Sequence, residues 1–431
     1  MVVSRLMRFF LSLALLLSSV HCSPPVEDVR DVEKAEAPSF DAAGVRSFLE
    51  TAVSEGRVAG AVGLVARGSE VLSFDAVGMA DREAGKPMEK DTLFRIASMT
   101  KPITSVAVMA LFDEGRIALD DPVSKFIPEF GKARVLKGDG SLDTVEASRE
   151  ITLRHLLTHT SGIAYRFVGT EPISTLYEDA GVSDGLVETI GTIAEGVRRL
   201  AGLPLLHQPG ERWTYSLSTD VLGRVVEVVS GQSLDVFLRE RIFAPLGMND
   251  TGFFPPQDQA GRMAVVYEWS ESEGLRRLPE EPITEGHLTY STTFHFNGPR
   301  TYFSGGGGLA STAPDYFRFA RMLRNGGELD SVRILTPETV ALMTENHIGE
   351  LSMGLDPGTE PEIRFGLGLS VKTTADQKGG RGTFGWAGFY HTLFWIDPEN
   401  DLIAIFLSQL RLPQDQDVSG DFQRAVYEAL P

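Results

Sequence analysis

The sequence predicts a mixed α/β fold of the α+β class, in which helices flank a central antiparallel sheet and a mostly helical lobe lies beside it. Strand-like runs occur near both ends of the 431-residue chain, whereas helical spacing dominates its middle. The hydrophobic content of 42% is sufficient for a full core. We expect an active-site cleft between the sheet and the helical lobe.

The first elements are expected in the order helix, strand, strand, helix. Apolar residues have helical spacing over residues 40–56, and Gly56 is a typical helix end. The runs "VAGAVGLVAR" and "EVLSFDAVGMAD", joined through "GSE", predict a hairpin. The segment that begins at Ser98 is expected to form the next helix.

The middle of the chain, from about 120 to 300, contains helical stretches separated by clusters of Pro, Gly and Asp. These stretches are "TLRHLLTH", "VSDGLVETIGTIAEGVRRLA" and "SLDVFLRERIFAPLG", and "VLKGDGSLDTVEASREI" predicts a hairpin inserted among them. The C-terminal part predicts helices at Asp315–Leu323 and Pro337–Glu345 and a last helix at about 420–430. Three strands are expected between them, at "RFGLGLSVKTT", "TFGWAGFYHTLFWID" and "LIAIFLSQL".

Composition divides the chain into an export signal at 1–22, a flexible Pro-rich and charged tether at 23–39, and a single domain at 40–430. Within the domain, we expect the sheet lobe from residues 40–120 and 300–430 and the helical lobe from residues 121–299.

The N-terminus has the pattern of an export signal. Arg5 and Arg8 precede the apolar run Phe9–Leu17, which is too short to span a bilayer. Removing residues 1–22 takes away two arginines and no acid, so the formal charge changes from −19 to −21. Such an acidic chain is not expected to bind nucleic acid or anionic lipid. We expect an exported protein in the periplasm, the cell envelope or the medium.

Cys22 is the only cysteine, which excludes an internal disulfide and a metal site built from several cysteines. Its position at the end of the signal suggests lipid attachment after cleavage, which would be the only membrane contact. Bacterial lipoprotein signals usually have Leu three positions before the cysteine and a small residue directly before it, whereas this chain has Ser19 and His21. Ordinary cleavage is therefore favoured, and acylation of Cys22 remains the alternative.

Ser98 lies three residues before Lys101, a spacing that places both side chains on one face of a helix. A serine hydroxyl needs a neighbouring base to become a nucleophile, and a lysine acts as base only when neutral, which burial favours. Pro102 is tolerated only in the first turn of a helix, so Ser98 is expected at the helix N-terminus or in a short tight turn that leads into it, where backbone N–H groups would face an oxyanion. The alternative is a helix-capping Ser98 with a solvent-facing Lys101.

Six segments in a fixed order resemble the class C β-lactamase-like serine hydrolase superfamily, with motifs nearest those of the family VIII-type carboxylesterases. They are "FRIASMTKPIT", "LDDPV", "ITLRHLLTHTSGI", "QPGERWTYS", "GGGGLAST" and "WAGFYHTLFWIDPEN". The resemblance covers residues 40–430 and implies a β-lactamase/penicillin-binding-protein-like fold with Ser98 as nucleophile. It also implies a mechanism without a metal or an organic cofactor.

By this resemblance, Tyr215 matches the tyrosine of a Tyr-x-Asn motif, which helps the lysine to activate the serine and to protonate the leaving group. A tyrosine accepts a proton only as phenolate, and a nearby lysine ammonium stabilises a phenolate. Taken alone, Tyr215 would be read as a core aromatic. The third motif position is Leu217 instead of Asn, as in related esterases. Ser218 and Asp220 are candidates for the missing polar contact, but we favour helix capping for both.

The third motif of the superfamily is matched by Trp386, Ala387 and Gly388. The resemblance implies that Gly388 lets substrate approach its strand and that the backbone N–H of Phe389 completes an oxyanion hole with that of Ser98. Trp386 replaces the cation that would hold a substrate carboxylate, which favours neutral acyl groups. A core position for Trp386 is the alternative. A cation nearby, Lys378 or Arg381, would restore the positive charge.

Other candidate residues are assigned structural roles. Neither His155 nor His159 is expected to be catalytic, because the chain has no Gly-x-Ser-x-Gly motif and the resemblance gives their loop a structural part. His391 is expected in the wall of the cleft. The glycine run 304–308 lacks a following Lys-Ser or Lys-Thr, which favours a tight turn at the cleft over a phosphate loop. No His-Glu-x-x-His occurs, so zinc catalysis has no support.

The sequence therefore predicts an exported serine hydrolase that acts through an acyl-enzyme on a small-molecule ester or amide, most simply a carboxylesterase for small or medium acyl groups. Hydrolysis of β-lactams or trimming of D-amino acids from peptidoglycan is the alternative reaction, and Leu217 and Trp386 disfavour it. A non-catalytic binding or sensor protein is the alternative of another class. Such a protein would not need to retain Ser98, Lys101 and Tyr215 together.

Overall fold

The computed structural model describes residues 39–354, 362–411 and 417–431. The predicted signal peptide, Cys22 and nearly all of the predicted tether lie outside the described residues. Phe40–Pro431 form one compact unit. Within the described ranges, no helix combines the length and the apolar character needed to cross a membrane.

The central sheet has eight strands, each antiparallel to its neighbours, in the order β14-β15-β16-β17-β18-β1-β2-β3. Their bounds are β14 Ile363–Phe365, β15 Ser370–Lys372, β16 Phe384–Gly388, β17 Thr392–Asp397, β18 Leu402–Leu407, β1 Gly60–Arg67, β2 Glu70–Asp81 and β3 Lys86–Pro87. The N- and C-terminal parts meet where β1 pairs with β18, in a register that sets Leu64 opposite Ile405. The predicted antiparallel sheet and its first hairpin are therefore confirmed.

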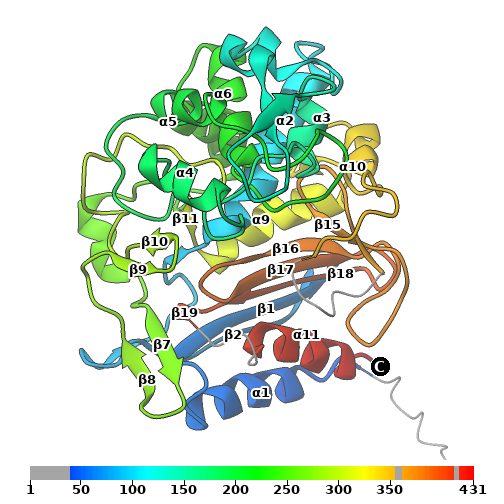
Figure 1. Ribbon diagram of the computed structural model, residues 1–431. Helices are drawn as coiled ribbons and strands as arrows, with labels where there is room; N and C mark the ends of the chain where they lie inside the picture. The colour runs from blue at the N-terminus through cyan, green and yellow to red at the C-terminus, as the bar shows by residue number, and fades with distance from the viewer. Residues whose placement is uncertain (1–38, 355–361, 412–416) are drawn as a thin grey trace, which may run out of the picture. The chain divides into compact units, whose positions relative to one another are not determined.

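Two helices from opposite ends of the chain cover one face of the sheet. They are α1 (Ala42–Ser54) and α11 (Val418–Glu428), which lie below the sheet in Figure 1. The α1 helix begins at Asp41, whose carboxylate accepts from the backbone N–H of Gly44 at 2.9 Å. Buried Leu49 of α1 and Phe422 of α11 share a core with Trp395 of β17. The first and last helices of the described chain therefore pack side by side in one layer on this face of the sheet.

The opposite face carries α9 (Ala313–Arg324) and, beyond it, the helical lobe (Figure 1). At the centre of the lobe, α2 (Thr100–Asp113) is buried along nearly all its length and packs against α6 (Ser218–Ser230). The remaining helices are α3 Leu153–Leu157, α4 Ile173–Asp179, α5 Ile193–Ala201, α7 Leu234–Leu238, α8 Ala244–Leu246 and α10 Pro337–Met343, with a π-helical turn at Arg239–Phe243 between α7 and α8.

Short strands outside the main sheet bring distant segments together. The expected hairpin in the middle of the chain forms from β5 (Arg134–Leu136) and β6 (Thr144–Glu146). Residues 257–299, which were expected in the helical lobe, contain two further hairpins near the sheet. Their strands are β7 Tyr267–Ser270, β8 Gly274–Arg277, β9 Ile283–Glu285 and β10 Leu288–Tyr290, and the other short strands are β4 Phe94–Arg95, β11 Ala310–Ser311, β12 Glu328–Leu329, β13 Val332–Arg333 and β19 Leu410–Arg411.

Three predicted elements were wrong in extent. The stretch "RFGLGLSVKTT" forms β14 and β15 as separate strands, because the chain turns at Gly368 with a φ of 89°. The expected long strand over 383–397 is a hairpin of β16 and β17, with His391 in the left-handed region at a φ of 55°. Only the last part of "VSDGLVETIGTIAEGVRRLA" is helical, because α5 begins at its own capping box on Thr192.

Candidate active site

Ser98 lies in a single 3₁₀ turn, Ala97–Met99, that leads directly into α2. The preceding residue, Ala97, is buried and has a φ of 41°, a left-handed conformation that residues other than glycine seldom adopt. Pro102 falls in the first turn of α2, as expected, where its missing N–H breaks no helical hydrogen bond. The first N–H groups of this helical segment lack partners within the helix and carry partial positive charge beside Ser98.

Strand pairing fixes the chain just before Ser98. The two-residue strand β4 pairs with β11 in antiparallel orientation, and Arg95 lies opposite Ala310. The buried Arg95 guanidinium donates to the backbone oxygen of Ala264 at 2.8 Å and to the side chain of Gln409 at 3.1 Å, and burial lowers its pKa to about 10. The segment just before Ser98 is therefore held both by its pairing with β11 and by the hydrogen bonds of the Arg95 side chain.

Lys101 is 1% exposed, so the solvent-facing alternative is excluded. Its Nζ donates to Ser98 Oγ at 3.3 Å, to Tyr165 Oη at 2.9 Å and to the carbonyl of Gly306 at 2.7 Å. An ammonium group has three N–H donors, and these three acceptors match them. A neutral amine would have two hydroxyl groups, those of Ser98 and Tyr165, toward which its lone pair can point.

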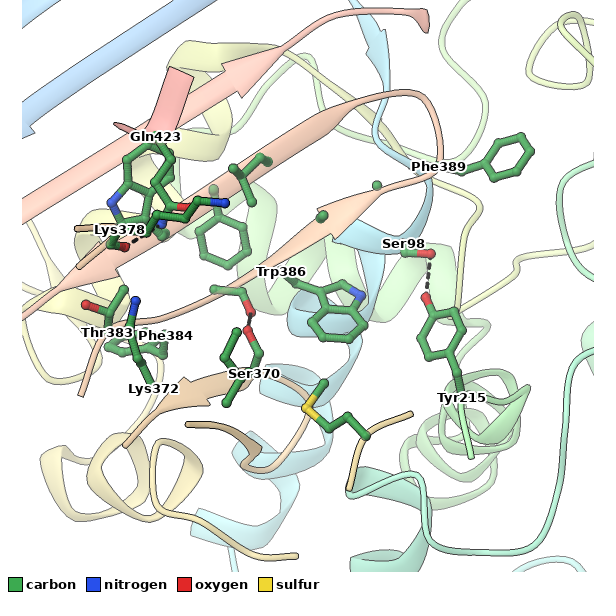
Figure 2. A pocket seen from close by; sticks show the side chains of 18 of the residues that line it. Ser98, Tyr215, Ser370, Lys372, Lys378, Thr383, Phe384, Trp386, Phe389 and Gln423 are labelled. Atoms are coloured by element: carbon green, nitrogen blue, oxygen red, sulfur yellow. Dashed lines mark hydrogen bonds between the residues drawn. The ribbon is translucent and has the colours of Figure 1, made fainter. Parts of the chain in front are cut away.

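Tyr215 reaches Ser98 from the segment that precedes α6, and its hydroxyl donates to Ser98 Oγ at 2.6 Å (Figure 2). Its ring packs against those of Trp213 and His159, with centroids 6.1 and 5.1 Å away, and Lys101 Nζ lies 4.5 Å from the ring centroid. Tyr215 is thus both a buried aromatic and a contact of Ser98. The structure brings together the three residues that the sequence analysis placed in one site.

Tyr165 and Gly306 belong to the same cluster but were missed. Burial and the nearby phenol of Tyr215 hold the pKa of Tyr165 above its ordinary value, so Tyr165 is a neutral acceptor for Lys101. Gly306 lies in the glycine run, which forms the expected turn at the cleft. Tyr165 sits three residues after the "TSG" of a quoted motif, and that proximity was the available signal.

The predicted capping role of Ser218 and Asp220 was wrong. The N-cap of α6 is Leu217, which makes no side-chain capping hydrogen bond. The Ser218 hydroxyl instead bonds to those of Ser161 and Ser216, both at 2.8 Å. Asp220 is buried, and burial raises the pKa of its carboxyl to about 6. Neither helix capping nor solvent exposure explains this carboxyl.

Strand β16 borders the site with the predicted residues Trp386, Gly388 and Phe389. A Cβ at Gly388 would lie 2.4 Å from the carbonyl of Ile96, so glycine allows the strand to touch the segment just before Ser98. Phe389 follows the strand, and its ring points away from Trp386, toward Tyr290 at 5.2 Å between centroids (Figure 2). From Trp386 to Gly388 the strand pairs only with β17 among the described strands, which leaves its other edge open.

Ser98 opens into a cavity of about 920 Å³ whose lining is largely aromatic and aliphatic. Trp386 faces it and packs on Tyr215 and Phe365, with centroids 5.7 and 5.2 Å away. The indole N–H of Trp386 is buried without a hydrogen-bond partner among the described residues and lies on the Ser98 side of the ring (Figure 2). Further walls come from Tyr165, Phe167, Leu186, Met353 and Ile363.

The two cations proposed to replace the missing charge at Trp386 lie elsewhere. Lys378 lines the cavity at the end away from Ser98 (Figure 2). Arg381 does not line it, and its backbone N–H bonds to Glu399 at 2.8 Å. A third cation, Lys372, also reaches the cavity but is paired with Asp376. No cation of the described wall therefore takes the place of the missing one beside Ser98.

The histidines have structural contacts. His155 Nδ1 accepts from the backbone N–H of Thr152 at 3.2 Å in a capping box. His159 bonds to the hydroxyl of Ser216 at 2.9 Å, and burial lowers its pKa well below the ordinary value. His391 forms the turn after β16, where its N–H donates to Gly388, and it is not a cavity-lining residue. In the described ranges, no cluster of His, Cys, Asp and Glu is arranged to hold a metal ion.

A model of the protein family described as Beta-lactamase matches residues 45–428. Esterase EstB of Burkholderia gladioli is 37% identical over 386 residues, which cover 86% of this chain and 92% of EstB. Protein Rv1367c of Mycobacterium tuberculosis is 39% identical over 377 residues, covering 85% and 89%. The solved structure of EstCE1, described as a hydrolase with promiscuous acyltransferase activity, superposes with a TM-score of 0.78 at 30% identity and covers 90% of this chain and 98% of EstCE1.

Proposed function

Because this chain belongs to the Beta-lactamase family, among its serine hydrolases and esterases, we propose that it is a carboxylesterase for small or medium acyl esters. The family resemblance and the β-lactamase-like fold expected from the motifs are confirmed, and so is the class of enzyme. The substrate and the roles of individual residues are our proposal. We further propose that residues 40–430 act as one catalytic domain.

In the proposed reaction, Ser98 Oγ attacks the ester carbonyl while its proton passes to the Lys101–Tyr215 pair. The contacts of 3.3 and 2.6 Å support this, because both groups lie within reach of the proton to be moved. The backbone N–H groups of Ser98 and Phe389 hold the oxyanion. When the intermediate collapses, the bond to the alcohol breaks and the alcohol leaves with the proton.

The acyl group then remains on Ser98 as an ester. Water attacks it, gives its proton to the same pair, and releases the acid and free Ser98. An alcohol in place of water would complete an acyl transfer, which is consistent with the promiscuous acyltransferase activity of EstCE1. No step requires a cofactor.

Two features favour a neutral ester over a β-lactam or a peptide. Trp386 occupies the position of the carboxylate-binding cation. Of the two lysines that line the cavity, Lys378 lies at the end away from Ser98 and Lys372 is paired with Asp376. Leu217 is buried at the start of α6 and does not line the cavity, so no side-chain amide is offered from that position. A large, mostly apolar cavity suits an acyl or alkoxy group of low polarity.

The observation that carries the proposal is the convergence of Lys101 Nζ and Tyr215 Oη on Ser98 Oγ, which a binding protein does not need. We expect brief exposure to p-nitrophenyl butyrate to give turnover and, in mass spectrometry, a butyryl adduct on Ser98. Ser98→Ala should show neither. A penicillin should give little adduct and little turnover.

Each other outcome has a distinct meaning. Fast penicillin turnover without ester cleavage would replace the esterase by a β-lactamase or peptidase. The absence of both reactions would favour the non-catalytic binding protein. Turnover that persists in Ser98→Ala would place the nucleophile elsewhere.

We also propose that the protein is exported, on the basis of the signal pattern in residues 1–22. Expression of the full chain should give a shortened protein outside the cytoplasm. N-terminal sequencing then distinguishes ordinary cleavage from a blocked, acylated Cys22. An unprocessed chain that stays in the cytoplasm would contradict export.

A further inference from the structure

Asp220 is a buried carboxyl that the proposed mechanism does not use. It lies in the first turn of α6, five residues after Tyr215, and is 1% exposed. Neither of its carboxylate oxygens has a hydrogen bond of normal geometry to a described residue, although the Ser304 hydroxyl and the Gly306 N–H face it and lower its pKa. A buried carboxyl without good partners is unfavourable unless it has another role.

Gly306 brings Asp220 to the lysine of the active site. The carbonyl of Gly306 accepts from Lys101 Nζ at 2.7 Å. The Cβ that Gly306 lacks would lie 2.6 Å from Asp220 Oδ2 and 2.7 Å from Tyr165 Oη. Only a glycine therefore allows the carboxyl of Asp220 and the phenol of Tyr165 to approach this point of the backbone together.

The hydrogen-bond partners of Lys101 carry no negative charge. They are a serine hydroxyl, a tyrosine hydroxyl and a backbone carbonyl, and the pKa of Tyr165 is held above its ordinary value. The attraction of Lys101 lowers the pKa of Asp220 against the larger effect of burial, which raises it. Asp220 is thus a buried acid that interacts with this buried ammonium.

Other charged and titratable groups face Asp220 without replacing it. Asp184 raises the pKa of Asp220, but its own carboxylate is already paired with Arg166 at 2.9 Å. Tyr302, which lies just before the glycine run, has its pKa raised by burial and by Asp220. Unlike Asp184, Asp220 has no ion-pair partner of its own among the described residues, so its carboxylate is available to interact with Lys101.

We infer that Asp220 is a positioning residue whose carboxylate is the counter-charge of Lys101 and sets the pH range in which Ser98 is acylated. This inference rests on the proposed function. A negative charge beside this cluster opposes the loss of positive charge from it, so an ionised Asp220 disfavours the state that accepts the Ser98 proton. Removing that charge should let the base act at lower pH.

The test is the pH profile of kcat/KM for p-nitrophenyl butyrate in wild type and in Asp220→Asn, which keeps the shape and removes the charge. We expect the acid limb to move by about one pH unit toward lower pH. Asp315→Asn is the matched control, because Asp315 is also a buried acid at the third position of a helix, in α9, and its carboxylate bonds to Asp250 and Thr251 away from the cavity. Its acid limb should not move.

An acid limb that stays in place in Asp220→Asn overturns the inference, even if the rate falls, because a purely structural role lowers the rate without moving the limb. If Asp220→Asn does not fold, the smaller Asp220→Ala is measured in the same way. A limb that moves equally in Asp315→Asn also overturns it.

A second measurement is independent of activity, so that failure of the proposed function can be recognised separately. Unfolding midpoints in urea at pH 8 are compared for wild type, Asp220→Asn, Lys101→Met and the double variant. If the two groups are a charge pair, Asp220→Asn should raise the midpoint more in the Lys101→Met background than in wild type. Equal effects in both backgrounds overturn the inference, and this result decides it if the wild type proves to have no esterase activity.

Discussion

Lys101→Met should lower kcat/KM for p-nitrophenyl butyrate by about a thousandfold or more. Methionine fills a similar volume but cannot accept the Ser98 proton, and general-base catalysis contributes about a hundredfold to ten-thousandfold. The change also removes the hydrogen bonds of Lys101 Nζ to Ser98, Tyr165 and Gly306 and its contact with the ring of Tyr215. Because the groups of such a cluster act as a unit, the single change should remove most of the rate.

The measurement is steady-state kinetics beside a circular dichroism spectrum that reports folding. Lys378→Met is the matched control, since this lysine lines the same cavity at the end away from Ser98 (Figure 2). It should change kcat/KM by less than about threefold, because this half-buried lysine lies far from Ser98 and touches no reacting atom. A folded Lys101→Met enzyme with more than a tenth of the wild-type rate would show that another group is the base.

Local sequence spacing was enough to find part of this site. Ser98 and Lys101 are three residues apart, and Pro102 fixes where their helix begins, so their relation follows from helix geometry alone. Tyr215 is 117 residues from Ser98, and only the resemblance to a known family joined the two. A contact over that distance depends on how α2 packs against the start of α6, which periodicity does not reveal.

Sequence reasoning missed Gly306 and gave Asp220 the wrong role. Gly306 contributes a carbonyl oxygen, and no residue type signals that a particular carbonyl will accept from a lysine. Asp220 was interpreted as a helix cap because acids are common there, but the capping position falls at Leu217. A shift of a few residues in the helix start thus places the expected helix cap inside the first turn, where its carboxyl is buried.

The strand predictions were limited in the same way, because local sequence reveals some elements of the sheet and hides others. Alternating apolar residues correctly predicted β1 and β2, and their antiparallel pairing followed from the short connection. The turn between β16 and β17 was missed because residues 389–391 include no glycine, proline or asparagine, and Gly388 before them was assigned to the strand. His391 takes the left-handed conformation instead. That turn positions Phe389 and Gly388, so an error of secondary structure fell beside the expected oxyanion hole.

The roles of the two tyrosines can be separated by removing the same oxygen atom from each. Tyr215→Phe should lower kcat by about a hundredfold to a thousandfold, because the hydroxyl that lies 2.6 Å from Ser98 Oγ would no longer exchange a proton with it. Tyr165→Phe should lower kcat by about tenfold or less, because its hydroxyl contacts Lys101 Nζ at 2.9 Å and has no hydrogen bond to Ser98.

Rapid-quench kinetics of acyl-enzyme formation and decay would show which step each tyrosine serves. Loss of Tyr215 should slow both, since the proton of Ser98 in acylation and that of water in deacylation pass through the same atoms. If Tyr165→Phe is instead the more damaging change, protons pass from Lys101 through Tyr165, and the ring of Tyr215 serves chiefly to pack against Trp386 and His159. The ratio of the two rate losses therefore assigns the proton path more directly than either variant alone.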